Sequence, residues 1–227
     1  MEEILIRTPE DLRPGDLFLG DIGGLAGIGV RAGHMILKEQ FEIMDLKVLH
    51  AAILTEGGAR RQLAQSMPRG AEVVELDERK HWNAKCAWVR LPEDYPGQAL
   101  DAAAVALAMV KAGVSYSPLS YLSLAAYRFG VRQERLLKWI NRRRPAGPTI
   151  KLHGPWPGQL HTPQLPVEAI CSVFVDQAWT LTGKQVMEGV RPQAVTPGAL
   201  AGQLFGFPGA TWAIPLGPGK VARSWVI

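Results

Sequence analysis

The sequence predicts a single α+β domain. Strand-like segments gather in the first half of the chain, helical periodicity dominates from residue 98 onward, and one more strand-like segment lies near the C-terminus. Strands that cluster instead of alternating with helices are typical of the α+β class. The length of 227 residues suits one domain spanning 1–227, and 47% hydrophobic with 20% charged residues is the composition of a soluble globular protein.

The first half contains five predicted strands bounded by turn residues. They are expected at 16–19, 48–55, 61–66, 72–76 and 86–91. The second and third of these are predicted to form a hairpin, because Gly57 and Gly58 lie between them. Residues 23–38 are expected to be helical, with glycines that lower the helix propensity.

The second half is predicted to be mainly helical. A first helix is expected over 98–112, a second over 119–143 with a break near Gly130, and a third from Pro166 to Gly183. Apolar spacing in the first helix predicts a core-facing stripe, since residues three and four apart share one helical face. That stripe comprises Leu100, Ala103, Ala104, Leu107 and Val110.

Proline and glycine punctuate the remaining segments. Residues 145–166 are rich in both and are expected to form one long ordered loop, of the kind that is often functional in compact domains. A last strand is expected at 212–216, where Pro215 favours a position at the edge of the sheet because proline cannot donate a ladder hydrogen bond.

Composition and motifs narrow the class of protein. Cys86 and Cys171 are the only cysteines, too few for a disulfide framework, and His153 and His161 lack metal-ligand spacing, so no metal or other cofactor is expected. The acidic start of the chain is unlike a secretory signal, and the longest apolar stretch, Ala102–Val110, is too short to span a membrane. A cytoplasmic location is the default expectation, with signal-independent export as the alternative.

Cys171 and His50 are the residues whose placement favours chemistry. Cys171 falls in the first turn of a predicted helix, where free backbone N–H groups and the helix dipole stabilise a thiolate. A nucleophilic cysteine also needs a base, which a histidine on a distant strand can supply once the chain folds. The competing interpretation is a small buried cysteine on an apolar helix, which is common.

Six short motifs follow one another along the chain. They are Arg13-Pro14-Gly15-Asp16, His50-Ala51-Ala52-Ile53, Gly57-Gly58, Gly113-Val114-Ser115-Tyr116, Cys171-Ser172 and Thr196-Pro197-Gly198-Ala199-Leu200. Their joint order resembles the circularly permuted branch of the NlpC-type, papain-like cysteine hydrolases, which includes YiiX-like proteins. The resemblance implies a permuted papain-like fold, with an antiparallel sheet or small barrel packed against helices.

The resemblance also implies roles for individual residues. Cys171 would be the nucleophile, His50 the general base and later acid, and Gln65 the residue that orients the imidazole. Such proteins often carry a carboxylate at the third position, so Gln65 is a departure, and the alternative candidates are Glu56, Glu72 and Glu75. Tyr116 and Ser172 would bind the oxyanion or the substrate beside the backbone N–H of Cys171. The competing interpretations are a core aromatic for Tyr116 and a solvent-facing strand residue for Gln65.

A cationic segment lies between the predicted apolar helix and Cys171. Residues 128–151 hold eight basic residues and one acidic residue, a local charge of +7, whereas the whole chain carries +4. We expect a helical and loop insertion at about 118–166. One interpretation is a solvated helix face, and the other is a docking surface for an anionic lipid or cell-wall polymer. The segment contains no recognised nucleic-acid-binding module. The arginines concerned are Arg128, Arg132, Arg135, Arg142, Arg143 and Arg144.

Three functions fit these expectations. The first is a cysteine hydrolase that cleaves an amide or peptide bond, such as that of a peptidoglycan stem peptide, through an acyl-enzyme. The second is an acylhydrolase or acyltransferase that acts on a lipid or other ester at the same Cys-His site. The third is a binding module without catalysis, in which Cys171 is structural and the cationic segment is the working surface.

Overall fold

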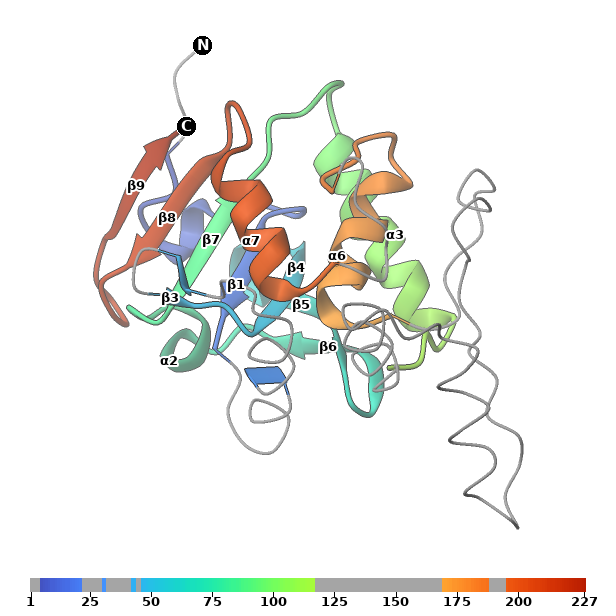
Figure 1. The fold of residues 1–227 in the computed structure, drawn as a ribbon. Coiled ribbons are helices and arrows are strands. Elements are labelled where there is room, and N and C mark those ends of the chain that lie inside the picture. The colour runs from blue at the N-terminus through green and yellow to red at the C-terminus, as the bar shows by residue number, and fades with distance from the viewer. Residues whose placement is uncertain (1–4, 22–29, 32–41, 44–45, 117–168, 188–194) are drawn as a thin grey trace.

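The fold is built on one antiparallel sheet. The computed structural model describes residues 5–21, 30–31, 42–43, 46–116, 169–187 and 195–227. Within them, seven strands pair in the order β6-β5-β4-β1-β7-β8-β9 (Figure 1). The strands are β1 Leu17–Gly20, β4 His50–Glu56, β5 Gln62–Met67, β6 Gly70–Glu75, β7 Cys86–Arg90, β8 Thr211–Pro215 and β9 Ala222–Val226. A separate short pair joins β2 Glu42–Ile43 to β3 Leu46–Lys47.

The predicted α+β class is confirmed, and the strands form a sheet. Each of the strands expected in the first half is present, with its bounds shifted by one or two residues. The last expected strand is β8, but Pro215 does not lie at an edge, because β9 pairs with β8 and Pro215 lies opposite Ala222 at the end of the ladder. Proline is tolerated there since strand ends need fewer ladder donors. β9 itself was not predicted from the sequence.

Helices α3, α6 and α7 pack against the sheet (Figure 1). They span Gln98–Lys111, Cys171–Thr180 and Pro197–Phe205. α3 and α6 contact each other and both contact β4 and β5. The core between them and the sheet includes Ala51 and Ile53 from β4 and Phe174 and Ala178 from α6. Alternate residues of β4 face this core, as the period of two in a strand requires.

The face of α3 that meets the core differs from the predicted stripe. Leu100 is 59% exposed and Ala104 is also exposed, whereas Ala103 is buried as expected. The helix is apolar around most of its circumference, so spacing alone does not fix its rotation. Small side chains face the core and let the helix approach closely. The buried residues are Gln98, Ala102, Ala103, Ala106 and Met109.

A second core covers the opposite face of the sheet. Phe18 from β1 and Trp88 from β7 pack there edge to face, with ring centroids 5.5 Å apart. The short helix α2, Glu78–His81, is followed by the fully buried Trp82. Both indole N–H groups are satisfied, because Trp82 donates to the Lys220 carbonyl and Trp88 to the His81 carbonyl. Large aromatic rings thus close this face with little polar cost.

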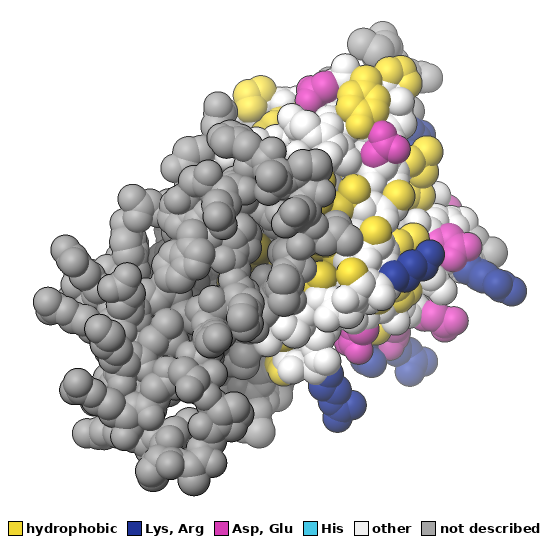
Figure 2. Space-filling view, turned by 90° about the vertical axis from the view of Figure 1, so that its right-hand side faces the viewer, with side chains coloured by type: hydrophobic (Ala, Val, Ile, Leu, Met, Phe, Trp, Pro, Cys, Tyr) yellow, Lys and Arg dark blue, Asp and Glu magenta, His cyan; other side chains and the backbone are white. Residues whose placement is uncertain are grey.

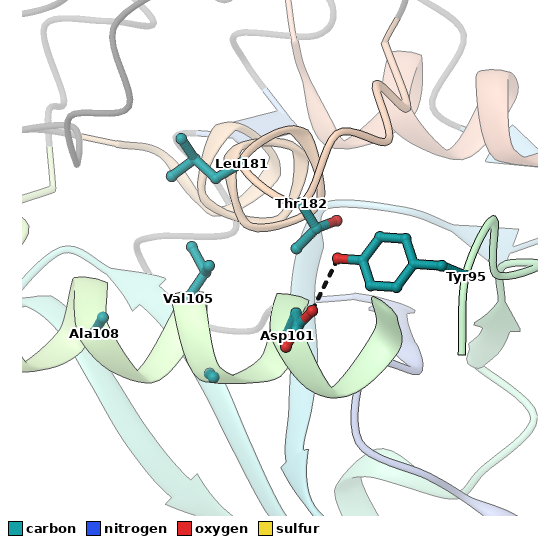
Figure 3. Close-up of a pocket in the computed structure, with 7 residues that line it drawn as sticks. Tyr95, Asp101, Val105, Ala108, Leu181 and Thr182 are labelled. Carbon is teal, nitrogen blue, oxygen red and sulfur yellow. Dashed lines mark hydrogen bonds between the residues drawn. The ribbon is translucent and has the colours of Figure 1, made fainter. Parts of the chain in front are cut away.

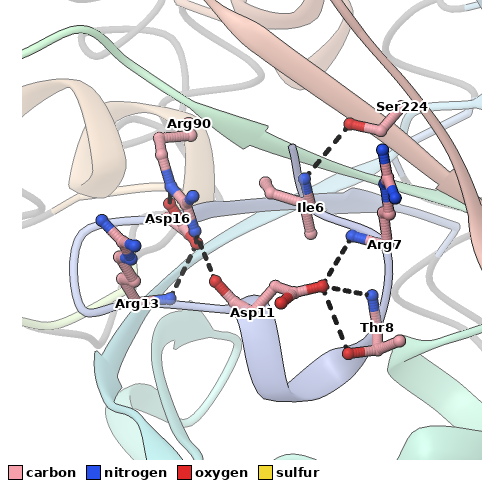
Figure 4. A network of polar contacts seen from close by, with 8 residues as sticks. All are labelled: Ile6, Arg7, Thr8, Asp11, Arg13, Asp16, Arg90 and Ser224. Carbon is pink, nitrogen blue, oxygen red and sulfur yellow. Dashed lines mark hydrogen bonds and ion pairs between the residues drawn. The ribbon is translucent and has the colours of Figure 1, made fainter. Parts of the chain in front are cut away.

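A buried ion pair anchors the start of β1 (Figure 4). Arg90 donates to both carboxylate oxygens of Asp16, at 2.8 and 2.7 Å, and to the carbonyl of Asp11 at the end of the 3-10 helix Pro9–Asp11. The preceding Gly15 has φ +92°, and a Cβ there would lie 2.6 Å from the Ala99 carbonyl oxygen at the start of α3. Glycine followed by aspartate is therefore required by turn geometry, close helix packing and charge pairing.

Several predicted features fall outside the described residues. Among them are most of the helix expected at 23–38, the helix at 119–143, the loop at 145–166 and the cationic segment. The proposed insertion at about 118–166, with Arg128, Arg132, Arg135, Arg142, Arg143 and Arg144, therefore stays a prediction.

Candidate active site

His50 and Gln65 meet on one face of the sheet. β4 and β5 pair so that Ala52 lies opposite Gln65, which places Gln65 diagonally across from His50 on the same face. The side chains form a hydrogen bond in which His50 Nε2 lies 2.8 Å from Gln65 Oε1. Gln65 is buried. The alternative interpretation of Gln65 as a solvent-facing strand residue is therefore wrong.

Glu72 lies behind Gln65 on the next strand. The two residues are opposite each other in the β5–β6 ladder, and Gln65 Nε2 donates a 3.0 Å hydrogen bond to Glu72 Oε1. The other acidic candidates, Glu56 and Glu75, are exposed residues at the ends of their strands. Among the described residues, Glu72 therefore contacts the Gln65 amide, and it is Gln65 that contacts the His50 ring.

The imidazole of His50 is held in a dry environment. Its residue is only 5% exposed, and the ring lies edge-on to Phe18, with centroids 6.4 Å apart. Burial lowers the pKa of His50 to about 4, because the protonated ring loses hydration; the hydrogen bond to Gln65 opposes this shift and the nearby His81 adds slightly to it. His50 is therefore neutral at pH 7, the state that a general base requires.

Cys171 is the first residue of α6. Within the described residues this helix begins at Cys171, and its N-cap is Ile170, whose side chain makes no capping hydrogen bond. The helix ends at Thr180, and Gly183 follows with φ +88°, as a glycine after a helix C-terminus often does. Cys171 thus sits where the first-turn N–H groups have no partner within the helix and favour negative charge.

The backbone before Cys171 is fixed by two elements. Ser66 of β5 donates a 2.6 Å hydrogen bond to the Ala169 carbonyl, and the Ala169 N–H donates to the Ser115 carbonyl at 2.9 Å. Val114 in turn accepts from the Ala71 N–H at 2.8 Å, at the start of β6. The motif Gly113-Val114-Ser115-Tyr116 therefore connects β6 to the segment before α6 through backbone hydrogen bonds.

Adjacent residues of β5 thus position both members of the pair. Gln65 faces the side of the sheet that carries Phe18 and bonds His50, while Ser66 faces α6 and holds the segment that leads into Cys171. Successive strand residues point to opposite faces, so neighbouring positions can serve both sides. His50, at the start of β4, and Cys171 both line one cavity there.

His50 and Cys171 line the same cavity. Its volume is about 10 Å³, close to the lower limit for one water molecule. Cys171 is buried, with 2% of its surface exposed. The remaining described residues that line the cavity are Val30, Leu49, Ser66, Met67, Pro68 and Tyr116.

The two predicted oxyanion or substrate ligands differ in placement. Tyr116 lines the cavity and is half-buried, which fits both a role in the site and the alternative of a core aromatic with a solvated hydroxyl. Ser172 is fully buried, and its hydroxyl donates to the Val195 carbonyl just before α7. That hydroxyl links α6 to the α7 cap and is not available to a substrate, so we remove the Ser172 side chain from the candidate site.

The second cysteine has a different environment. Cys86 in β7 is buried and its sulfur lies 3.2 and 3.0 Å from the carbonyl oxygens of His81 and Asn83. Burial raises the pKa of the Cys86 thiol to about 12, with a partial offset from the Asn83 backbone. A thiol that stays protonated is a poor nucleophile. Cys86 is a residue of the second core.

A larger groove lies between α3 and the residues that follow α6 (Figure 3). It has a volume of about 420 Å³, and Tyr95 Oη donates across it to Asp101 Oδ2 at 2.8 Å. Its other lining side chains are alanine, valine, leucine and threonine. No histidine or cysteine is among the described residues that line it, so these residues offer no cysteine–histidine pair. Figure 2 shows apolar side chains lying among acidic and basic ones on the described part of the face it views.

The described residues contain no cluster of three or more His, Cys, Asp or Glu side chains arranged to hold a metal ion. No helix of the described part of the chain is long and apolar enough to cross a membrane. Comparison with known proteins adds no assignment, since no protein-family model matches the chain and no curated protein matches its sequence. The candidate site therefore stands on its geometry.

Proposed function

We propose that the protein is a cysteine hydrolase that cleaves an amide or peptide bond through an acyl-enzyme. The observation that supports this most is the shared cavity, lined both by Cys171 at the first position of a helix and by a neutral His50 whose ring is held by Gln65. A nucleophile, a base and a group that orients the base are the minimum set for this chemistry.

The tautomer of His50 assigns its working nitrogen. Gln65 Oε1 accepts a hydrogen bond, so Nε2 carries the ring proton and Nδ1 keeps its lone pair. Nδ1 would then take the proton of the Cys171 thiol as the sulfur attacks the substrate carbonyl. The buried imidazole resists protonation in the resting enzyme, and the developing thiolate–imidazolium pair would be stabilised by mutual attraction and by the N-terminus of α6.

The proposed cycle has two halves. In the first, the C–S bond forms, the carbonyl oxygen takes negative charge next to the helix N-terminus and Tyr116, and the C–N bond breaks as the amine leaves with the proton from His50. In the second, His50 takes a proton from water as the resulting hydroxide attacks the thioester carbonyl. The C–S bond then breaks, the carboxylic acid leaves, and the Cys171 sulfur takes the proton from His50. The resemblance set out above favours peptide bonds of the cell wall as substrates.

The test compares four proteins on two substrates. The wild type, Cys171→Ala, His50→Ala and Cys86→Ala are each incubated with purified peptidoglycan and with phospholipid vesicles, and mass spectrometry follows the products. The expected result is a new amine and carboxylate pair from peptidoglycan that is lost in the first two variants and kept in Cys86→Ala. Product that persists without Cys171 would overturn the thiol mechanism. Fatty acid release instead would assign ester chemistry, and binding without product would assign a non-catalytic module.

A further inference from the structure

The hydrogen-bond chain continues past the histidine to Glu72, and its polarity is fixed by chemistry. A glutamine amide has one accepting and one donating end, and either end can face a histidine nitrogen. A carboxylate only accepts. Because Glu72 Oε1 lies 3.0 Å from Gln65, the NH₂ group must face Glu72, and the carbonyl oxygen must face His50 at 2.8 Å.

We propose that Glu72 is a positioning residue that locks the tautomer of His50 through Gln65. With the amide held in this orientation, His50 Nε2 must donate and Nδ1 must keep its lone pair for Cys171. Without Glu72 the amide can turn over, present its NH₂ group to Nε2 and favour the opposite tautomer, in which Nδ1 carries the proton and cannot act as a base. This inference deepens the proposed function and rests on it for its catalytic consequence.

The lock also accounts for an amide at the third position. A neutral amide stabilises an imidazolium less than a carboxylate does, but hydrogen bonds in a chain polarise one another. Gln65 occupies the buried position next to His50. Glu72 lies beyond Gln65 in the hydrogen-bond chain and is half-buried. The negative charge is thereby kept on the more exposed strand β6, at less desolvation cost than a carboxylate at position 65 would carry.

Four substitutions test the lock in the full-length protein. Glu72→Gln can accept or donate and so no longer fixes the polarity of the chain, Glu72→Ala removes the accepting group, and Glu72→Lys replaces it with a donor that requires the amide to turn over. The matched control is Glu75→Lys, the same charge change on the same strand at an exposed position outside this hydrogen-bond chain. Thermal melting followed by circular dichroism checks that each variant is folded.

The direct readout is the tautomer itself. Long-range ¹H–¹⁵N spectra at pH 7.5 distinguish an Nε2-protonated from an Nδ1-protonated ring, and His50→Gln assigns the signal of His50. We expect the Nε2-protonated pattern in the wild type and in Glu75→Lys, a mixture in Glu72→Gln and Glu72→Ala, and the Nδ1-protonated pattern in Glu72→Lys. An unchanged His50 pattern in a folded Glu72→Lys protein would overturn the lock.

The second readout is the rate at which iodoacetamide alkylates Cys171 at pH 7. Loss of a correctly protonated base should slow it about 100-fold or more in Glu72→Lys, and Glu72→Gln, in which part of the molecules keep the correct tautomer, should stay within about fivefold of the wild type. A Glu75→Lys rate that falls as far as that of Glu72→Lys would show a general charge effect and contradict the lock. The tautomer readout does not depend on turnover, so a lock without hydrolysis would separate this inference from the proposed function.

Discussion

The hydroxyl of Ser66 donates a 2.6 Å hydrogen bond to the carbonyl oxygen of Ala169, two residues before Cys171. Both residues are buried, and their separation of 103 positions in the chain makes this a long-range tie between β5 and the N-terminus of α6. Because the neighbouring Gln65 bonds His50 on the other side of the sheet, one short stretch of strand sets the relative position of the base and the sulfur.

Replacement of Ser66 by alanine should therefore cost stability and slow Cys171. The Ala169 carbonyl would lose its buried donor, which destabilises by about 1–3 kcal/mol, and the start of α6 would be held less firmly. We expect urea unfolding to show that loss and iodoacetamide to alkylate Cys171 more slowly. Ser224→Ala is the control, since the Ser224 hydroxyl on β9 accepts a hydrogen bond from the Ile6 N–H, away from α6. An equal effect of both variants on alkylation would contradict the positioning role.

The two thiols should differ in reactivity in the folded protein. Cys171 starts a helix and lines the cavity, whereas Cys86 lies in the second core with a pKa raised by burial to about 12. We expect iodoacetamide at pH 7–8 to label one site, which peptide mapping places at Cys171, and to leave Cys86 unlabelled until denaturant is added. Label on Cys86 at a comparable rate without denaturant would show that the low reactivity assigned to it is wrong.

The strands could be predicted because their signal is local. Apolar runs such as that of β4, closed by glycine turns, define their own ends, and the hairpin register then brings Gln65 next to His50. The rotation of α3 could not be predicted, because alanines occur on several of its faces and only contact with the sheet chooses among them. β9 was missed for a different reason, since its pairing with β8 across Gly217 and Gly219 is what stabilises it.

The positions of Cys171 and His50 within their elements could also be predicted from local sequence signals. Cys171 at a helix start and His50 on a strand are local patterns, and the structure adds that they share a cavity. Two serine contacts could not be predicted from residue spacing, because they join residues far apart in the chain. They are those of Ser66 with Ala169 and of Ser172 with Val195. Serine hydroxyls satisfy whichever carbonyl the fold brings near, so their roles follow from tertiary structure.

Two buried groups should give the stability of the protein opposing dependences on pH. Burial lowers the pKa of His50 to about 4 and raises the pKa of Asp176, in α6, to about 6, the latter partly offset by the Met187 N–H. Below pH 6.5 the unfolded histidine takes up a proton that the folded one refuses, so the contribution of His50 is lost as pH falls towards 4. Asp176 takes up its proton in the folded state first, so its contribution grows as pH falls from 6. Each change is about 3 kcal/mol.

Single variants should expose the cancellation. Asp176→Asn keeps an accepting oxygen and removes the cost of a buried charge, so it should be about 3 kcal/mol more stable than the wild type at pH 7 and nearly equal at pH 4. In His50→Gln the free energy of unfolding relative to the wild type should rise over the same interval. Urea unfolding at pH 7, 6, 5 and 4 measures both. A difference between Asp176→Asn and the wild type that does not vary with pH would contradict the burial argument.

The last prediction concerns the ion pair between Asp16 and Arg90. Asp16 is 2% exposed and also accepts from the Arg13 N–H, so Asp16→Ala would leave the Arg90 guanidinium without its bidentate partner in a largely dry place. Loss of one member of a buried pair costs about 3–5 kcal/mol. Arg90→Met combined with Asp16→Ala should recover part of that cost, because no unpaired cation remains and the methionine fills the volume of the stem.

A surface pair supplies the control for this cycle. Lys80 Nζ lies 3.6 Å from Asp77 Oδ2, and the two side chains are 76% and 44% exposed. Solvent screens such a pair, so Lys80→Gln should cost less than about 1 kcal/mol. Urea unfolding of Asp16→Ala, Arg90→Met, the double variant and Lys80→Gln gives the comparison. If the stability losses of the two single variants add in the double variant, the Asp16 and Arg90 side chains do not stabilise the fold through each other. The start of β1 is then anchored by their separate contacts with the Arg13 N–H and the Asp11 carbonyl.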